Sequence, residues 1–183
     1  RNNKRITKHK NKIIFSLQIV PETDLDLKNQ MLTEIENIMR DLNTFPDERK
    51  PKVLLMNHPR YNNTMDLENL LKRFKFVSLI TNNEMLSNLD CILHITFYST
   101  TTFEMAMKGI PTYFLTSKNI LQSKIFLEEY NYPISQDTSL KELISFYQNN
   151  QKIRTSHGGL VEKWSNHYFK PLDENVFLEI INS

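Results

Sequence analysis

Residues 89–115 read LDCILHITFYSTTTFEMAMKGIPTYFL, and this stretch says more than any other about the 183-residue chain. An apolar run leads into a hydroxyl-rich turn, a short amphipathic segment, a Gly-x-Pro sequence and a second apolar run. Apolar runs bounded by turn residues are typical of buried strands, and Gly followed by Pro is a helix stop signal. The pattern predicts one strand, helix, strand unit whose turn lies where anions bind. We therefore expect a nucleotide or phosphate site.

The same alternation continues on both sides of this unit. The sequence predicts strands at 12–20, 52–56, 76–80, 90–95 and 111–115. It predicts helices at 24–42, 66–74, 84–88, 120–130, 139–149, 160–169 and 173–180, with a turn at 157–159. Alternating strands and helices indicate an α/β fold: a doubly wound, Rossmann-like parallel sheet of about five or more strands with helices on both faces. Ligands of such sheets bind beyond the carboxyl ends of the strands.

The composition is that of one soluble domain. Hydrophobic residues make up 39% of the chain, and no apolar run reaches the roughly 18 to 20 residues of a membrane-spanning helix. The single cysteine, Cys91, lies within an apolar run, which indicates a packing role and a reducing compartment. These features predict a cytoplasmic location.

The first 12 residues form a basic lead. Six positive charges precede the first acidic residue, Glu22. We interpret residues 1–12 as a solvated linker, with peripheral contact to an anionic inner-membrane surface as the alternative. Residues 13–183 would then form one domain, closed by helices over about 160–183. No zinc-finger spacing, basic helix or ribonucleoprotein signature follows, so we expect no nucleic-acid partner.

Two groups of residues are candidates for an anion site. Ser99, Thr100, Thr101 and Thr102 fall where a strand ends and a helix begins, so their hydroxyls join the free N–H groups of the helix N-terminus. The sequence His58-Pro59-Arg60 ends an earlier strand and would lie on the same edge of a parallel sheet. A histidine can donate to a phosphate oxygen, and an arginine offers a two-pronged donor.

Several polar residues also have a structural explanation. Thr101 with Glu104 forms a capping-box pattern, which by itself accounts for one threonine and the glutamate. The sequence Asp24-Leu25-Asp26 imitates a metal-binding motif, but a helix N-cap accounts for it better. His94 lies in an apolar run and is predicted to be a hydrogen-bonded core histidine, whereas His157 stays unassigned. We expect no tightly bound metal and no cofactor.

The turn, the Glu104 helix and the Gly109-Ile110-Pro111 stop resemble the nucleotide-sugar-binding, C-terminal domain of GT-B glycosyltransferases. Together with His58-Pro59 and Ser99-Thr100, the pattern is similar to the His-Pro and Ser-Ser/Thr motifs of bacterial sialyltransferases and related capsule and lipooligosaccharide enzymes. The resemblance covers about 110 residues, from Lys12 to about Tyr130. It implies a CMP-linked sugar donor, with His58 as the catalytic contact to the departing phosphate. By the same resemblance the nucleotide site comprises His58, Pro59, Arg60, Ser99, Thr100, Thr101, Thr102 and Glu104.

Two departures from the family pattern refine this expectation. Thr96 stands where retaining GT-B enzymes usually carry a second glutamate, which favours an inverting enzyme. Because we expect no tightly bound metal, we expect this enzyme to be metal-independent. No acidic residue precedes a glycine, so the acidic-acidic-Gly motif that holds the base in sialyltransferases is absent. The resemblance then implies that the base and the glycan or glycolipid acceptor site belong to an N-terminal domain, with this chain as the donor-binding part of an enzyme of surface polysaccharide synthesis.

Two alternatives stay open. Sugar-nucleotide 2-epimerases share the GT-B layout and need carboxylates in the cleft, for which Glu22 and Glu104 are the candidates. A non-enzymatic binding or signalling module, such as a receiver domain, would need an acidic pocket at the strand ends. The first strand instead ends in Gln18-Ile19-Val20.

Overall fold

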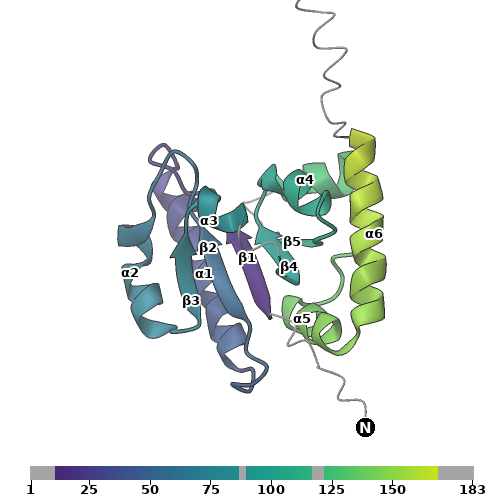
Figure 1. Cartoon of the computed structure of the whole chain (residues 1–183). Helices are drawn as coiled ribbons and strands as arrows, with labels where there is room; N and C mark the ends of the chain where they lie inside the picture. The colour runs from purple at the N-terminus through teal and green to yellow at the C-terminus, as the bar shows by residue number, and fades with distance from the viewer. Residues whose placement is uncertain (1–10, 87–89, 117–121, 169–183) are drawn as a thin grey trace, which may run out of the picture.

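The computed structural model describes residues 11–86, 90–116 and 122–168 (Figure 1). Five parallel strands form one sheet in the order β3-β2-β1-β4-β5. The strands are β1 (Lys12–Ser16), β2 (Lys52–Met56), β3 (Val77–Ile80), β4 (Leu93–Thr96) and β5 (Thr112–Phe114). The chain winds outward from β1 in one direction and from β4 in the other, so the order reverses between these two neighbours. This confirms the predicted doubly wound α/β fold and places its topological switch point beside β1 and β4.

Seven helical segments surround the sheet within the described ranges. They are α1 (Leu25–Asn43), α2 (Thr64–Arg73), α3 (Asn82–Leu86), α4 (Thr101–Ala106), the π-helix η1 (Ile125–Glu129), α5 (Leu140–Asn149) and α6 (Gln151–Tyr168). Apolar residues of α1, α2 and α5 pack with the sheet in one large cluster, which includes Phe15 and Ile35. A second cluster joins α3 and α4 to other strand residues, among them Ile14 and Met105. Because Ile14 and Phe15 are neighbours on β1, their side chains point to opposite faces, so helices cover both faces as predicted.

The longest helix of the described residues, α1, begins and packs as its sequence predicts. Asp24 is its N-cap, and the carboxylate accepts hydrogen bonds from the N–H groups of Asp26 and Leu27. Apolar side chains at helical spacing, including Met31, Ile35 and Leu42, are buried against the sheet. This confirms that the Asp24-Leu25-Asp26 sequence has a capping role. Ser139 and Glu142 form the corresponding capping box at the start of α5.

The largest error of the sequence prediction concerns residues 157–159. His157, Gly158 and Gly159 do not form a turn but lie inside α6, which is continuous from Gln151 to Tyr168. Gly158 is buried because α6 crosses the α4–β5 connection there, and a Cβ atom at Gly158 would lie 2.7 Å from the Gly109 carbonyl oxygen. The pair of glycines signals a close helix contact here, since only a residue without a side chain fits against Gly109. Figure 1 shows α6 along the β5 side of the molecule, with α4 and α5 at its two ends.

Several boundaries also differ from the prediction. β1 ends at Ser16 and not at residue 20, although Leu17 and Ile19 remain buried beyond it. Lys12 is the first residue of β1 and forms an ion pair with Asp90, so the domain includes a residue that was assigned to the basic lead. The predicted helix 120–130 is the π-helix η1 in its described part. Residues 1–10 of the lead and the predicted helix 173–180 lie outside the described residues.

Two core predictions are confirmed. His94 is fully buried on β4, and Cys91 packs against the second apolar cluster. In the ranges that the structure describes, no helix is both long and apolar enough to span a bilayer.

Candidate functional site

A pocket of about 340 Å³ lies at the carboxyl edge of the sheet, at the switch point. It is bounded by the end of β1, the segment after β2, helix α3 and the turn from β4 into α4. The lining residues are Ser16, Leu17, Met56, Asn57, His58, Pro59, Asn83, Met85, Ser99, Thr100, Thr101 and Glu104. Six of the eight predicted site residues are among them, so the fold brings the His-Pro segment and the hydroxyl turn together.

The hydroxyl turn is held in place by side chains from β1 and β4. Thr96 at the end of β4 accepts a hydrogen bond from the Ser99 N–H through its Oγ1, at 3.1 Å. The same Thr96 hydroxyl donates to Gln18 Oε1 at 2.9 Å, and Gln18 also accepts from the Phe97 N–H. All of these atoms are buried or nearly so. The turn is therefore a fixed element of the pocket wall, because its bonds are shielded from competing water.

The first N–H groups of α4 are already occupied. The Thr101 N–H donates to Ser99 Oγ, and the Thr102 and Phe103 N–H groups donate to the carbonyl oxygens of Ser99 and Thr100. The expected capping box of Thr101 and Glu104 does not form, because Thr100 is the N-cap and Thr101 is already the first helical residue. The Ser99 hydroxyl, one residue before the N-cap, accepts the Thr101 N–H instead. Since α4 has only six residues, donors for an anion must come mainly from side chains.

Two hydroxyls of the turn remain able to donate into the pocket. Thr101 Oγ1 accepts from the Ser99 hydroxyl at 3.0 Å, which leaves its own hydrogen available. The exposed Thr100 hydroxyl has no hydrogen-bond partner among the described residues. Ser99 itself is committed to the turn. Its contribution is therefore to orient Thr101.

His58 lines the same pocket, from the segment that follows β2. Its Nδ1 accepts the Arg60 N–H at 3.3 Å, which leaves Nε2–H as the donor. Partial burial, followed by the nearby Arg60 guanidinium, holds the pKa of His58 below its ordinary value, while Glu22 acts in the opposite direction. The ring is thus mainly neutral near pH 7, and a negative charge beside it would raise its pKa again.

The remaining two predicted residues do not line this pocket. Thr102 is fully buried within the fold, and its hydroxyl has no partner among the described residues. Arg60 is exposed and lines an adjoining hollow of about 480 Å³ on the other side of His58. His58 lines both the pocket and this hollow, whereas Arg60 lines the hollow alone.

The two carboxylates considered for acid–base chemistry both lie near the pocket. Glu104 lines it and is exposed, because it occupies the outer side of α4. Glu22, in the turn after β1, is close enough to raise the pKa of His58 electrostatically.

Sequence reasoning missed Ser16, Asn57 and Asn83 as pocket residues. Asn57 had a usable signal, since it directly follows β2 and precedes His58. Ser16 had none, because a serine inside an apolar strand has no feature that marks it as part of a pocket wall. Ser16 Oγ is hydrogen-bonded to Nε2 of the buried His94 at 2.7 Å.

In the described part of the chain, no three or more His, Cys, Asp or Glu side chains are grouped to hold a metal ion.

Fold and site together define a doubly wound α/β domain with a polar pocket, lined by hydroxyls and an imidazole, at its switch point. No protein-family model matches the chain, and no curated protein matches it. Among solved structures, the structure of the wall teichoic acid polymerase TagF is similar to this chain. The two share 15% sequence identity, and the TM-score is 0.47. The likeness covers 88% of this chain and 39% of that one, so the chain spans well under half of its neighbour's length.

Proposed function

We propose that this chain is the donor-nucleotide-binding domain of an inverting, metal-independent glycosyltransferase that uses a CMP-linked sugar. The observation that carries the proposal is the pocket at the switch point, where His58 and the Ser99–Thr101 turn line one cavity. This edge of a doubly wound sheet is where ligands of such folds bind. The motif resemblance to bacterial sialyltransferases supports the choice of donor.

Two groups of residues bind the phosphate in this proposal. Nε2–H of His58 donates to a phosphate oxygen and stabilises the negative charge that grows as the nucleotide departs. The hydroxyls of Thr100 and Thr101, which line the same pocket, donate to further phosphate oxygens, and Ser99 orients Thr101. A proton taken up by His58 would strengthen its hydrogen bond to the leaving group, because charge-assisted bonds are roughly twice as strong as neutral ones.

The proposal assigns the base that activates the acceptor to another domain, which would close over the carboxyl edge of this sheet. The acceptor is a glycan or glycolipid of surface polysaccharide synthesis. The chain alone is therefore expected to bind the donor without transferring its sugar.

Calorimetric titration of the chain with CMP, UMP, UDP and GDP in the presence of EDTA tests the proposal. Saturable binding with preference for CMP, weakened by His58→Gln, is the expected result. His167→Gln, an exposed histidine on α6, is the matched control and should bind as the wild type does. A preference for UDP would reject the CMP donor, and the absence of any nucleotide binding would reject the function. A parallel titration without EDTA is the comparison, and nucleotide binding that appears only without the chelator would reject metal independence.

A sugar-nucleotide 2-epimerase is a second candidate, favoured by one observation. Glu104 lines the pocket and Glu22 lies within electrostatic range of His58, so two carboxylates border the same site. Carboxylates are suitable general acids and bases for abstracting and returning a proton. Incubation of the intact protein with UDP-linked sugars separates the two functions, since an epimerase yields a new free sugar nucleotide without any acceptor.

A further inference from the structure

Basic side chains gather at the amino edge of the sheet, on the far side from the pocket. The parallel strands begin at this edge. The end of α5 lies beside it, because Gln148 Nε2 donates to Asn11 Oδ1 at 2.9 Å and to the Arg49 carbonyl oxygen at 2.8 Å. Figure 1 shows α5 at the end of the sheet where β1 begins. The basic residues of the edge include Arg49, Lys52, Lys75, Lys141, Lys152 and Arg154.

Separate segments of the chain bring these residues to one edge. Lys52 is the first residue of β2, and Lys75 lies two residues before β3. Lys141 Nζ lies 2.7 Å from Thr44 Oγ1, beside the end of α1. Lys152 and Arg154 lie in the first turn of α6. The basic edge is therefore a product of the sheet topology.

Most of these cations are not neutralised within the protein. No ion pair to a described residue is formed by Arg49, Lys52, Lys75, Lys141 or Lys152. The Arg49 guanidinium donates instead to the neutral amide oxygens of Gln148 and Asn149, at 3.4 and 3.2 Å. Its positive charge is held in place without being cancelled.

The carboxylates near this edge leave positive charge in excess. Asp47 is paired with Lys50 at 2.9 Å, and Asp90 with Lys12 at 2.8 Å. The carboxylates near the edge that pair with no cation of the described ranges are Asp41, Glu48 and Glu142. They are fewer than the unpaired cations, so the edge attracts anions.

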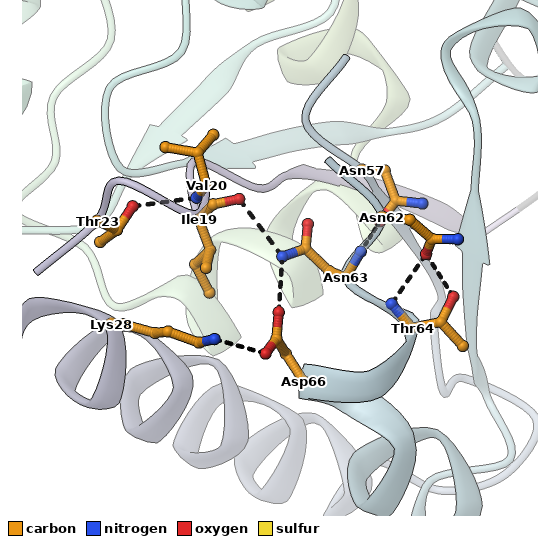
Figure 2. Close-up of polar contacts among 9 residues, drawn as sticks. All are labelled: Ile19, Val20, Thr23, Lys28, Asn57, Asn62, Asn63, Thr64 and Asp66. Carbon is orange, nitrogen blue, oxygen red and sulfur yellow. Dashed lines mark hydrogen bonds and ion pairs between the residues drawn. The ribbon is translucent and has the colours of Figure 1, made fainter. Parts of the chain in front are cut away.

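The opposite edge, which carries the pocket, has the reverse balance. The carboxylates there without an ion pair to a described residue are Glu22, Asp24, Asp26 and Glu104, and the exposed cation is Arg60. Lys28 is neutralised by an ion pair with Asp66 at 2.6 Å (Figure 2). The domain thus has a positive end and a negative end. An anionic surface would attract the amino edge and repel the edge of the pocket.

An exposed aromatic ring and the basic lead adjoin the positive edge. Phe146, about one turn before the end of α5, is 45% exposed. The lead of residues 1–12, with its six positive charges, joins the fold at the start of β1, which is part of the same edge. Basic residues bind anionic headgroups, and aromatic rings favour the boundary between headgroups and acyl chains. This combination fits a bilayer surface.

From this separation of charge we infer that the amino edge of the sheet docks on an anionic membrane surface, with the pocket directed away from the bilayer. The partner is a leaflet that contains negatively charged phospholipids. The inference does not depend on the proposed nucleotide-binding function, because none of the basic residues of the edge lines the pocket. In this orientation the carboxyl edge stays open to a second domain.

Co-sedimentation of the full chain with lipid vesicles tests the inference. The chain is expected to bind vesicles of mixed phosphatidylglycerol and phosphatidylcholine, and not vesicles of phosphatidylcholine alone. Binding should weaken steeply between about 50 mM and about 500 mM NaCl, because salt screens exposed charges.

A matched pair of charge reversals on α6 locates the contact. Lys152→Glu removes a cation from the edge and adds an anion, so it should lower the partition coefficient about 25-fold, or about fivefold for each unit of charge. Lys163→Glu makes the same change about three turns further along the same helix and should lower it less than about threefold. Lys52→Glu, on β2, should act as Lys152→Glu does. Phe146→Ser should lower partitioning about fivefold, since roughly half of the ring is available for transfer.

Each contrary outcome is specific. Equal losses in Lys152→Glu and Lys163→Glu would show that only net charge matters, and would overturn the docking face. Binding of Lys52→Glu and Lys152→Glu at the wild-type level would assign the contact to residues 1–12 and overturn it as well. So would the absence of binding to anionic vesicles, including the case in which the chain binds duplex DNA or RNA through Lys152 instead. Circular dichroism of each variant checks that the fold is intact.

Discussion

Nε2 of His94 lies 2.7 Å from Ser16 Oγ, so a hydrogen bond joins the buried centre of the sheet to the wall of the pocket. Nδ1 of the same ring lies 3.0 Å from Thr112 Oγ1 on β5. Burial lowers the pKa of His94 from its ordinary value of 6.5 to about 3, so the ring is neutral at physiological pH. A neutral imidazole has one donor and one acceptor, and both are satisfied between β1 and β5.

Removing either hydrogen-bond partner of His94 is expected to lower the free energy of unfolding, but only one of the two removals should lower nucleotide affinity. Ser16→Ala and Thr112→Val each leave one ring nitrogen unpaired in the core and should cost about 1–3 kcal/mol of unfolding free energy. Ser16 lines the pocket and Thr112 does not, so only Ser16→Ala should reduce nucleotide affinity, by about tenfold. Urea unfolding and calorimetry measure the two effects. Equal losses of affinity in both variants would show that Ser16 has no role in the pocket beyond stability.

The buried His94 makes stability fall in acid. The unfolded chain binds a proton at this ring below pH 6.5, whereas the folded state resists protonation down to about pH 3. Stability is therefore fully present above pH 6.5 and declines as the pH falls towards 3, by up to about 1.4 kcal/mol per pH unit from this group. Urea unfolding of the wild type and of His94→Gln across this window measures the difference in slope. Identical slopes would contradict the assignment, as would NMR titration that shows His94 protonated near pH 6.

His58 is expected to couple nucleotide binding to pH. A bound phosphate raises the depressed pKa of His58, so the complex binds more protons than the free protein and affinity gains as the pH falls through that pKa. The ligand's own phosphate also titrates near pH 6. The measurement is therefore the nucleotide affinity of the wild type divided by that of His58→Gln, taken between pH 5.5 and 8. This ratio should rise at the acidic end, by up to about tenfold for each unit by which binding raises the pKa of His58. A ratio that stays constant would remove His58 from the phosphate contact.

The two glycines of α6 are expected to respond in opposite directions to alanine. Gly158→Ala places a Cβ 2.7 Å from the Gly109 carbonyl oxygen and should cost about 1–3 kcal/mol, because backbone must shift to relieve the overlap. Gly159 has no atom within 4 Å of the corresponding position, so Gly159→Ala should stabilise α6 by about 0.5–1 kcal/mol. Chemical denaturation of the two variants is the measurement. A destabilising Gly159→Ala, or a neutral Gly158→Ala, would contradict the packing described here.

Much of the fold was predictable because local patterns agree with tertiary packing. β2 was predicted residue by residue, since an apolar run ends at Met56 directly before a proline segment. α1 and its Asp24 cap followed from helical spacing and capping chemistry. His58 and the Ser99–Thr101 turn were predictable as neighbours because parallel strands bring their carboxyl ends to one edge. Arg60 was expected beside them, but the turn after Pro59 directs it into the adjoining hollow.

The sequence by itself determined the alternation of strands and helices, the covering of both faces of the sheet and the edge at which the polar residues gather. Only the tertiary structure decided which strands are neighbours, and with them the bond from Ser16 to His94 across 78 positions of the chain. It also decided that Gly158 packs against Gly109, and that the Ser99 hydroxyl accepts the Thr101 N–H where a Thr101–Glu104 capping box was expected. The physical reason is the range of the interactions. Propensity and periodicity act over a few residues, whereas hydrogen bonds and close contacts between distant segments depend on which surfaces the folded sheet places together.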